Sequence, residues 1–189
     1  MLSKGRLFII SGSSGVGKRA IIEKLLANPR LNLVFSVSYT TRAKRFNEVH
    51  GVHYFFISKE EFIQNIESGK MLEYANFFGN YYGTSKEWVD NTLNEGKNVI
   101  LEIETLGFKQ ILEKCDDFVS IFIEAPSMEE LERRLRKRGT ESEEDIKIRL
   151  LKAEKEILVA PLFKYRVVND VLEDAIKEVE NIFLKAINQ

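Results

Sequence analysis

Short runs of apolar residues alternate with segments of helical periodicity along most of the chain. Uninterrupted apolar runs bounded by turn residues are typical of strands that are buried on both faces. Because helical segments separate these runs, the pattern predicts an α/β fold in which helices cover both faces of a parallel sheet. The predicted strands cover residues 7–11, 99–103, 118–123 and 166–169.

The helical segments between these strands carry start and stop signals. Asn28-Pro29 ends a helix predicted over about 18–27. A Ser-x-x-Glu capping box at Ser127 begins another helix, which Gly139 is expected to end. Two further helices are predicted from Ser142 and from about Leu172.

The stretch from Phe35 to Thr84 breaks this alternation. It is rich in short aromatic segments, such as Leu72 to Phe78, and holds one helix that a capping box at Ser58 begins. Gly79-Asn80 is a favourable two-residue hairpin turn between two of the aromatic segments. We therefore expect a small mixed α/β lobe inserted into the core fold.

Composition and charge limit the classes of function. The 189 residues fit one core domain carrying small lobes, and 44% hydrophobic residues suffice for a sizeable core. Lys and Arg (28) nearly balance Asp and Glu (29), so the overall charge predicts no nucleic-acid or anionic-membrane partner. The single cysteine, Cys115, excludes an intramolecular disulfide. No apolar run has the pattern of a signal peptide or a membrane span, so we expect a cytoplasmic protein.

The segment between the first strand and the first helix has the spacing of a P-loop. Glycines at these positions let the backbone wrap around phosphate oxygens, and the N-terminus of the helix adds free N–H donors. The lysine supplies a positive charge for the β- and γ-phosphates. A plain Gly/Ser turn is the alternative, but the strand–helix context favours phosphate binding. The segment reads Gly12-Ser13-Ser14-Gly15-Val16-Gly17-Lys18.

The two residues after this lysine depart from the P-loop pattern. A Ser or Thr is expected there as a Mg²⁺ ligand, and Arg19 and Ala20 lack a hydroxyl. Arg19 is expected either to project toward a phosphate or to remain an exposed arginine. Glu102 lies at the end of the predicted buried strand that begins at Val99, and Glu104 follows two residues later. An acid at such a position usually reaches Mg²⁺ or its waters. Glu102 is therefore the candidate metal-binding residue, and we expect it to contact Mg²⁺ through water.

Arginines occur in two groups that suit phosphate oxygens. Arg42 and Arg45 follow a strand-like segment, with Tyr54 nearby, and guanidinium groups bind such oxygens bidentately. On the predicted helix from Ser127, Arg134 and Arg138 share one face. A solvated basic loop and a charged surface helix are the respective alternatives.

Several sequence blocks, in order along the chain, are similar to guanylate kinases, and the similarity runs nearly end to end. The most specific blocks are FSVSYTTR at 35–42, EVHGVHYFF at 48–56, GNYYGT at 79–84, LEIE at 101–104, RGTES at 138–142 and VND at 168–170. The resemblance implies a P-loop NTPase-type core over about 1–33, 85–125 and 155–189. It also implies a GMP-binding lobe over about 34–84 and a helical lid over about 126–154.

The resemblance further implies the substrates ATP and GMP, with Mg²⁺ accompanying ATP. The implied GMP phosphate and positioning contacts are Ser38, Arg42, Arg45, Tyr54 and Tyr82, and the implied guanine readers are Glu73, Thr84 and Glu104. Lys18 and the lid arginines Arg134, Arg138 and Arg149 are the implied catalytic residues, and Asn169 matches a position near the adenine. The oligomeric state is left open, and a homodimer is one alternative.

Some positions differ from the family pattern. Ser13 replaces a proline, Glu102 stands where aspartate is commoner, and Gly107 lacks the usual preceding glutamine. A catalytically weakened module that binds GMP or a phosphorylated protein partner is therefore an alternative, as is a kinase for another monophosphate. Retention of Lys18, Arg134 and Arg138 argues against the first, and the acidic pair Glu73/Glu104 argues against AMP as acceptor.

Overall fold

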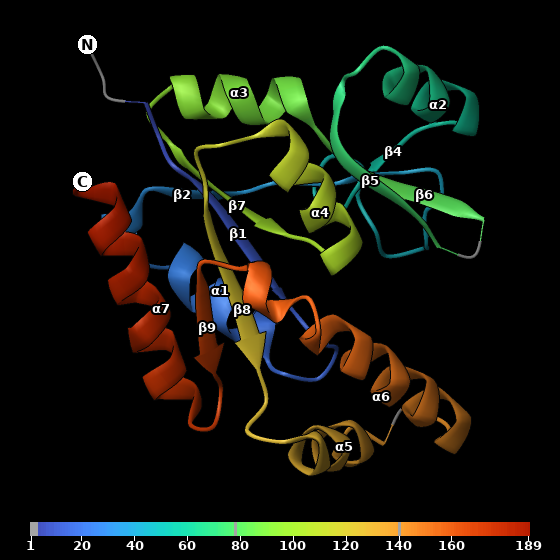
Figure 1. The fold of residues 1–189 in the computed structure, drawn as a ribbon. Helices are drawn as coiled ribbons and strands as arrows, with labels where there is room; N and C mark the ends of the chain where they lie inside the picture. Colours follow the sequence, from blue (N-terminus) through green and yellow to red (C-terminus); the bar gives the residue numbers. More distant parts are fainter. Residues whose placement is uncertain (1–3, 78, 140) are drawn as a thin grey trace.

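Two β-sheets organise the computed structural model, which describes residues 4–77, 79–139 and 141–189 (Figure 1). The larger sheet has five strands, and every pair of neighbours in it is parallel. The predicted α/β fold with a parallel core sheet is thus confirmed. In spatial order its strands are β2 (Leu33–Phe35), β7 (Asn98–Glu102), β1 (Leu7–Gly12), β8 (Val119–Glu124) and β9 (Tyr165–Val168).

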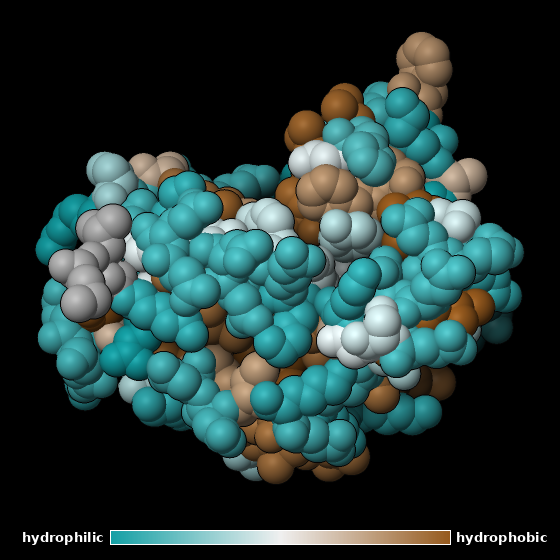
Figure 2. Space-filling model, turned by 90° about the horizontal axis from the view of Figure 1, so that it is seen from above, coloured by the Kyte–Doolittle hydropathy of each residue, from teal (hydrophilic) through white to brown (hydrophobic). Residues whose placement is uncertain are grey.

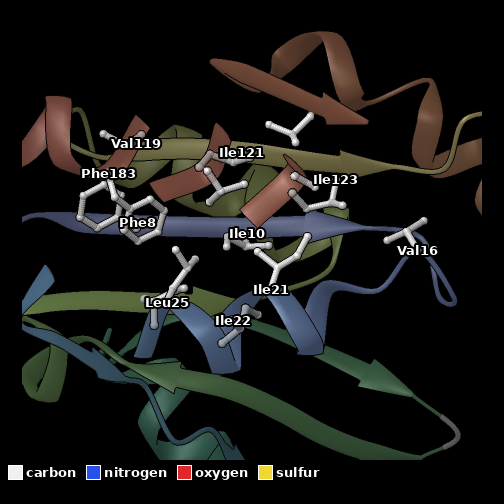
Figure 3. Packing of buried hydrophobic residues seen from close by; sticks show 14 of the residues in the cluster. Phe8, Ile10, Val16, Ile21, Ile22, Leu25, Val119, Ile121, Ile123 and Phe183 are labelled. Atoms are coloured by element: carbon white, nitrogen blue, oxygen red, sulfur yellow. The ribbon is translucent and has the colours of Figure 1, made fainter. Parts of the chain in front are cut away.

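The core sheet is covered by helices on both faces because its central strands are apolar on both sides. In β1, Phe8 and Ile10 face one hydrophobic cluster, and Leu7 and Ile9 face the other. The rings of Phe8 and Phe183 stack at 3.8 Å between centroids, which joins β1 to the last helix (Figure 3). The first face packs on α1 (Lys18–Leu26), α7 (Leu172–Ile187) and parts of α5 (Met128–Lys137) and α6 (Glu143–Ile157), and the second on α3 (Lys86–Asn94) and α4 (Thr105–Lys114).

The second sheet and one helix make up the expected mixed lobe. In spatial order across this sheet, the first two strands run parallel to each other, and the two later pairs of neighbours are antiparallel. Phe62 of the helix is fully buried and stacks on Tyr81 at 5.3 Å between ring centroids. In spatial order the strands are β4 (Phe55–Phe56), β3 (Tyr39–Thr40), β6 (Asn80–Ser85) and β5 (Met71–Phe77), and the helix is α2 (Lys59–Glu67).

Helices α5 and α6 form a hairpin that projects beyond the carboxyl ends of the core strands (Figure 1). Ser142 caps α6 with a full capping box, in which Asp145 is the reciprocal partner. Leu131 and Leu135 are buried on the inner side of α5. Short 3₁₀ helices, Pro29–Leu31 and Ala160–Leu162, complete the connections.

The structure differs from the sequence expectations at two places. Asn80 pairs with Phe77 in the ladder, so the hairpin turn lies one residue earlier than predicted, with Gly79 at φ +82° in the left-handed region. The core sheet also extends over Leu33–Phe35, which the sequence did not predict as a strand, because these residues pair with β7. Phe78 and Thr140, which belong to two of the predicted segments, lie outside the described residues.

Hydrophilic side chains cover most of the face seen in Figure 2, and apolar residues gather there in small patches. Within the described part of the chain, none of the helices combines the length and the apolar character needed to cross a bilayer.

Candidate functional site

The P-loop joins β1 to α1, as the sequence predicts. Gly17 precedes α1 with φ +92°, and a Cβ there would lie 2.5 Å from Nδ2 of Asn169, so only glycine fits without strain. No side chain of the described residues caps α1, so the N–H groups of its first turn are free to bind an anion.

Lys18 folds over this loop. Its ammonium donates hydrogen bonds to the carbonyl oxygens of Gly12 and Ser13, the latter at 3.0 Å. Burial lowers the pKa of Lys18, and the negative charges of Glu102 and Glu156 oppose that shift. The ammonium is held at the loop by two uncharged carbonyl oxygens, which phosphate oxygens can replace.

Asn169 supports the P-loop from the end of β9. Its buried side-chain amide donates to the carbonyl oxygen of Val16 at 2.7 Å, and its backbone carbonyl oxygen accepts from Arg134 at 2.8 Å. A role near adenine stays a prediction. The contact present in the structure is structural, since it fixes the backbone of the loop that carries the free N–H groups.

The arginines of the α5–α6 hairpin converge on the P-loop. Arg149 donates to the hydroxyl of Ser14 at 2.6 Å and pairs with Glu141 at 3.0 Å. Arg138 lines a cavity together with Ser14, Lys18 and Arg19. Arg134 lies further back, held by Glu130 at 2.7 Å and by the backbone of Asn169.

Arg19 forms an ion pair on the surface of α1. Its side chain is 89% exposed and pairs with Glu23 one turn along α1, at 2.9 Å. The Arg19 side chain therefore lies on the surface, at the edge of the P-loop cavity and not over the loop. This direction is expected because a cation is unfavourable at the positive N-terminal end of a helix.

Two adjoining cavities of about 420 and 380 Å³ form one cleft between the P-loop and the lobe. The first contains Lys18 and Arg149 in its wall, and the second contains Glu73. The residues that line both cavities are Ser38, Tyr54, Glu102, Ile103 and Glu104.

Glu73 lies at the buried polar end of the second cavity, and Thr84, which does not line that cavity, contacts Glu73. The Thr84 hydroxyl donates to Oε1 of Glu73 at 2.6 Å, and Glu73 is only 6% exposed. Burial raises the pKa of Glu73, and the hydrogen bond from Thr84 opposes this. Gly107 was not predicted as part of the site, yet a Cβ there would lie 2.4 Å from Oε2 of Glu73. A glycine inside a helix is the signal that could have marked it.

The predicted phosphate-binding arginines differ in position. Arg42 makes a bidentate ion pair with Glu48, at 3.0 and 2.7 Å, and its guanidinium lies 5.5 Å from the ring centroid of Tyr54. Arg42 and the backbone N–H of Arg45 hold the pKa of Glu48 down at about 2. The side chain of Arg45 is exposed, and neither Arg45 nor Arg42 lines either cavity. Tyr82 lines the second cavity, 5.9 Å from Tyr54 between ring centroids.

Acidic and basic side chains complete the cleft wall, and of these Lys152 and Glu156 were not singled out by the sequence. Glu102 ends β7 and faces the cleft beside Lys18. Lys152 of α6 pairs with Glu104 at 2.7 Å, and Glu156 of the same helix is buried with a pKa raised by that burial. Among the described residues, no three His, Cys, Asp or Glu side chains gather closely enough to hold a metal ion by themselves.

Comparison with known proteins identifies the family. A family model described as guanylate kinase matches residues 4–186. The guanylate kinase of Mesoplasma florum is 49% identical over 185 residues, a match that covers 98% of this chain and 62% of that protein. That of Mycoplasmoides gallisepticum is 48% identical over 182 residues, covering 96% of this chain and 93% of that protein. This chain therefore spans less than two thirds of the first relative and nearly all of the second.

The structural comparison agrees with the sequence comparison. A crystal structure of guanylate kinase from Anaplasma phagocytophilum superimposes with a TM-score of 0.76 at 32% identity, over 99% of this chain and 88% of that chain. The family that the sequence blocks indicated is confirmed, with the P-loop, the mixed lobe and the helical hairpin in the order that those blocks imply. The chain belongs to the guanylate kinase family.

Proposed function

We propose that the chain transfers the γ-phosphoryl group of ATP to GMP, giving ADP and GDP, within the cleft between the P-loop and the lobe. Membership of the guanylate kinase family supports this function. The observation that carries it is the continuity of the cleft, which has Lys18 at one end and the buried Glu73 at the other. In this proposal residues 34–84 are the GMP-binding lobe and residues 126–154 the lid, and the protein is cytoplasmic.

On the donor side, the P-loop backbone and the first turn of α1 would hold the β- and γ-phosphates. Lys18 would exchange its two carbonyl partners for phosphate oxygens. Arg138 and Arg149 lie where they can neutralise charge that spreads over the transferring group. Arg134 would hold this arrangement together through the backbone of Asn169.

Mg²⁺ bound with ATP would supply positive charge that offsets the charge of the phosphates, and Glu102 would hold it through water. The residues present fit a metal held mainly by phosphate and water. Glu102 offers an exposed carboxylate in the cleft beside Lys18, whereas Arg19 and Ala20 offer no hydroxyl. Mg²⁺ usually keeps several of its waters in such sites, so one missing protein ligand is tolerable.

On the acceptor side, GMP would lie with its base at Glu73 and its phosphate toward Lys18. Guanine has donors at N1 and N2, which carboxylates of Glu73 and Glu104 can accept, while the Thr84 hydroxyl already orients one of those carboxylates. Ser38, Tyr54 and Tyr82 line the path between base and phosphate. A GMP phosphate oxygen is already a nucleophile, so the residues act by positioning and by charge stabilisation.

Replacing Arg42 by alanine is expected to raise the KM for GMP about tenfold, with a smaller change in kcat, because the lost contact is to the acceptor and not to the transferring group. In the structure its fork is held by Glu48, so the variant also removes the partner that positions this loop. Steady-state kinetics with GMP as the varied substrate measure the effect. Arg30→Ala, an exposed arginine of the first 3₁₀ helix, is the control. An unchanged KM would place the phosphate of GMP elsewhere.

The double variant Arg19→Ser/Ala20→Thr is expected to lower the Mg²⁺ concentration needed for half-maximal GMP-dependent ADP formation, because it restores a P-loop hydroxyl. Arg19→Ala is the matched control, since it removes the exposed ion pair with Glu23 without adding a hydroxyl. Superimposable Mg²⁺ titrations of wild type and double variant would show that these positions do not affect metal handling.

The proposed activity is tested by a coupled ADP-release assay with ATP and each of the four common nucleoside monophosphates. GMP should be the preferred acceptor by a wide margin. Absence of turnover with all four, together with binding of GMP or of a phosphopeptide, would support the alternative of a non-catalytic binding module. The convergence of Arg138 and Arg149 on the P-loop favours the enzyme. Light scattering of the same sample tests the homodimer left open by the sequence.

A further inference from the structure

Lys152 connects three parts of the molecule that the proposed reaction must bring together. It belongs to α6, and its ammonium lies 2.7 Å from Oε1 of Glu104, at the start of α4. The same ammonium lies 5.4 Å from the ring centroid of Phe77 in the lobe and 3.8 Å from Glu156. One side chain of the helical hairpin thus reaches both the core and the lobe across the cleft.

The neighbouring arginine of the same helix contacts the donor side. Arg149 precedes Lys152 by three residues, so the two lie on the same face of α6, and Arg149 donates to Ser14 in the P-loop. Because one helix carries both groups, a ligand that draws Arg149 toward phosphate also holds Lys152 at Glu104.

The ion pair between Lys152 and Glu104 leaves an acceptor free for a guanine base. Lys152 occupies only Oε1 of Glu104, and a carboxylate can accept through both oxygens. The ammonium occupies one oxygen of this carboxylate and leaves Oε2 as an acceptor. In the open cleft both partners are almost half exposed, with 46% and 43% of their side-chain surfaces accessible, and such a pair contributes little. A bound base would exclude water from it and strengthen it.

We propose that Lys152 is a positioning residue that couples binding of ATP beneath the α5–α6 hairpin to recognition of guanine by Glu104. The inference rests on the proposed function, and it adds that each substrate raises the affinity for the other through this ion pair. Thermodynamic reciprocity requires the two effects to be equal in size.

The test is calorimetric titration of GMP into the full chain, with and without saturating Mg²⁺ and a non-hydrolysable ATP analogue. In wild type the analogue should tighten GMP binding at least about fivefold, the lower end of ordinary coupling. Lys152→Met, which keeps the apolar stem against Phe77, should bring that ratio close to one and leave GMP binding without analogue nearly unchanged. Lys152→Arg should retain the coupling. Lys155→Met, at an exposed position on the same helix, is the control and should behave as wild type.

A cycle with Glu104→Gln localises the effect, since Lys152→Met should remove no further coupling in that background. Unchanged coupling in Lys152→Met, or absence of coupling in wild type, would overturn the inference. Tighter GMP binding by Lys152→Met without analogue would also overturn it, because the pair would then compete with guanine. A fall in kcat with intact coupling would assign the ammonium to the phosphoryl group instead. Since wild-type turnover of GMP tests the proposed function separately, the two failures are distinguishable.

Discussion

Lys18→Ala should lower kcat for phosphoryl transfer by about 10²- to 10³-fold, the usual effect of removing one preorganised donor to developing charge. The expectation follows from where the ammonium lies. It lies partly buried at the P-loop, and its partners in the structure are two backbone carbonyls. In the proposed function those contacts would be exchanged for phosphate oxygens when ATP binds, so we expect the lost interaction to be specific to the reacting complex. GMP affinity, which depends on the other end of the cleft, should stay nearly the same.

Steady-state kinetics and calorimetry with GMP separate these two effects. Lys24→Ala, an exposed lysine in the last turn of α1, is the matched control and should keep wild-type kinetics. Thermal unfolding of Lys18→Ala checks that the loop still folds. Near-normal turnover by a folded Lys18→Ala protein would refute the assignment of the P-loop as the donor site.

Glu73→Gln should reduce kcat/KM for GMP by about 10²-fold or more, because a buried site built to accept hydrogen bonds then presents a donor. The Thr84 hydroxyl can continue to donate to the amide oxygen, as it does to Oε1 of Glu73. The NH₂ group is then directed to the position of Oε2, facing donors of guanine. The weak reaction with AMP should change much less. Equal losses for GMP and AMP would make Glu73 a structural residue only.

The same carboxylate predicts a pH dependence. Burial raises the pKa of Glu73 above its ordinary value of about 4.3, so this group gains a proton earlier as the pH falls. The protonated form has lost acceptor capacity, and the KM for GMP should therefore rise as the pH falls through the raised pKa. Glu73→Gln lacks this group, so its KM for GMP should rise less than that of the wild type over that range. A profile of KM against pH for both proteins checks this.

The regular parts of the fold could be predicted because their signals are local. The apolar runs of β1, β7 and β8, and the capping residues Ser127 and Ser142, act within a few neighbouring positions. Strand β2 was missed because three half-buried or exposed residues carry no pattern, and pairing with β7 alone makes them a strand. The turn at Gly79 was misplaced by one residue because the register with β5 decides which position takes the positive φ.

In the candidate site, too, residues with a local sequence signal could be predicted, and residues placed by packing could not. The P-loop could be predicted since its glycines and lysine are contiguous, whereas Lys152 and Glu156 face the cleft only through the packing of α6 on the core. Gly107 belongs to the site because the carboxylate of Glu73 passes over it, and although a glycine inside a helix is a signal, the sequence does not say which residue contacts it. The direction of Arg19 likewise depended on Glu23, one turn away on the same helix. Roles inferred from the family resemblance, such as that of Asn169 toward adenine, stay predictions.

The order of strands in the core sheet has a consequence for synthesis of the chain on the ribosome. β1 is made first, but it lies between β7 and β8, and Leu7 pairs with Val99. At about 5–20 residues per second, the roughly ninety residues between those partners take about 5–20 s to translate. During that time the apolar strand and the loop after it have neither neighbour in the sheet. Phe183, whose ring stacks on Phe8 of β1, is made later still. A nascent chain of this protein should therefore bind nucleotide only near the end of translation, and should depend on chaperones until then.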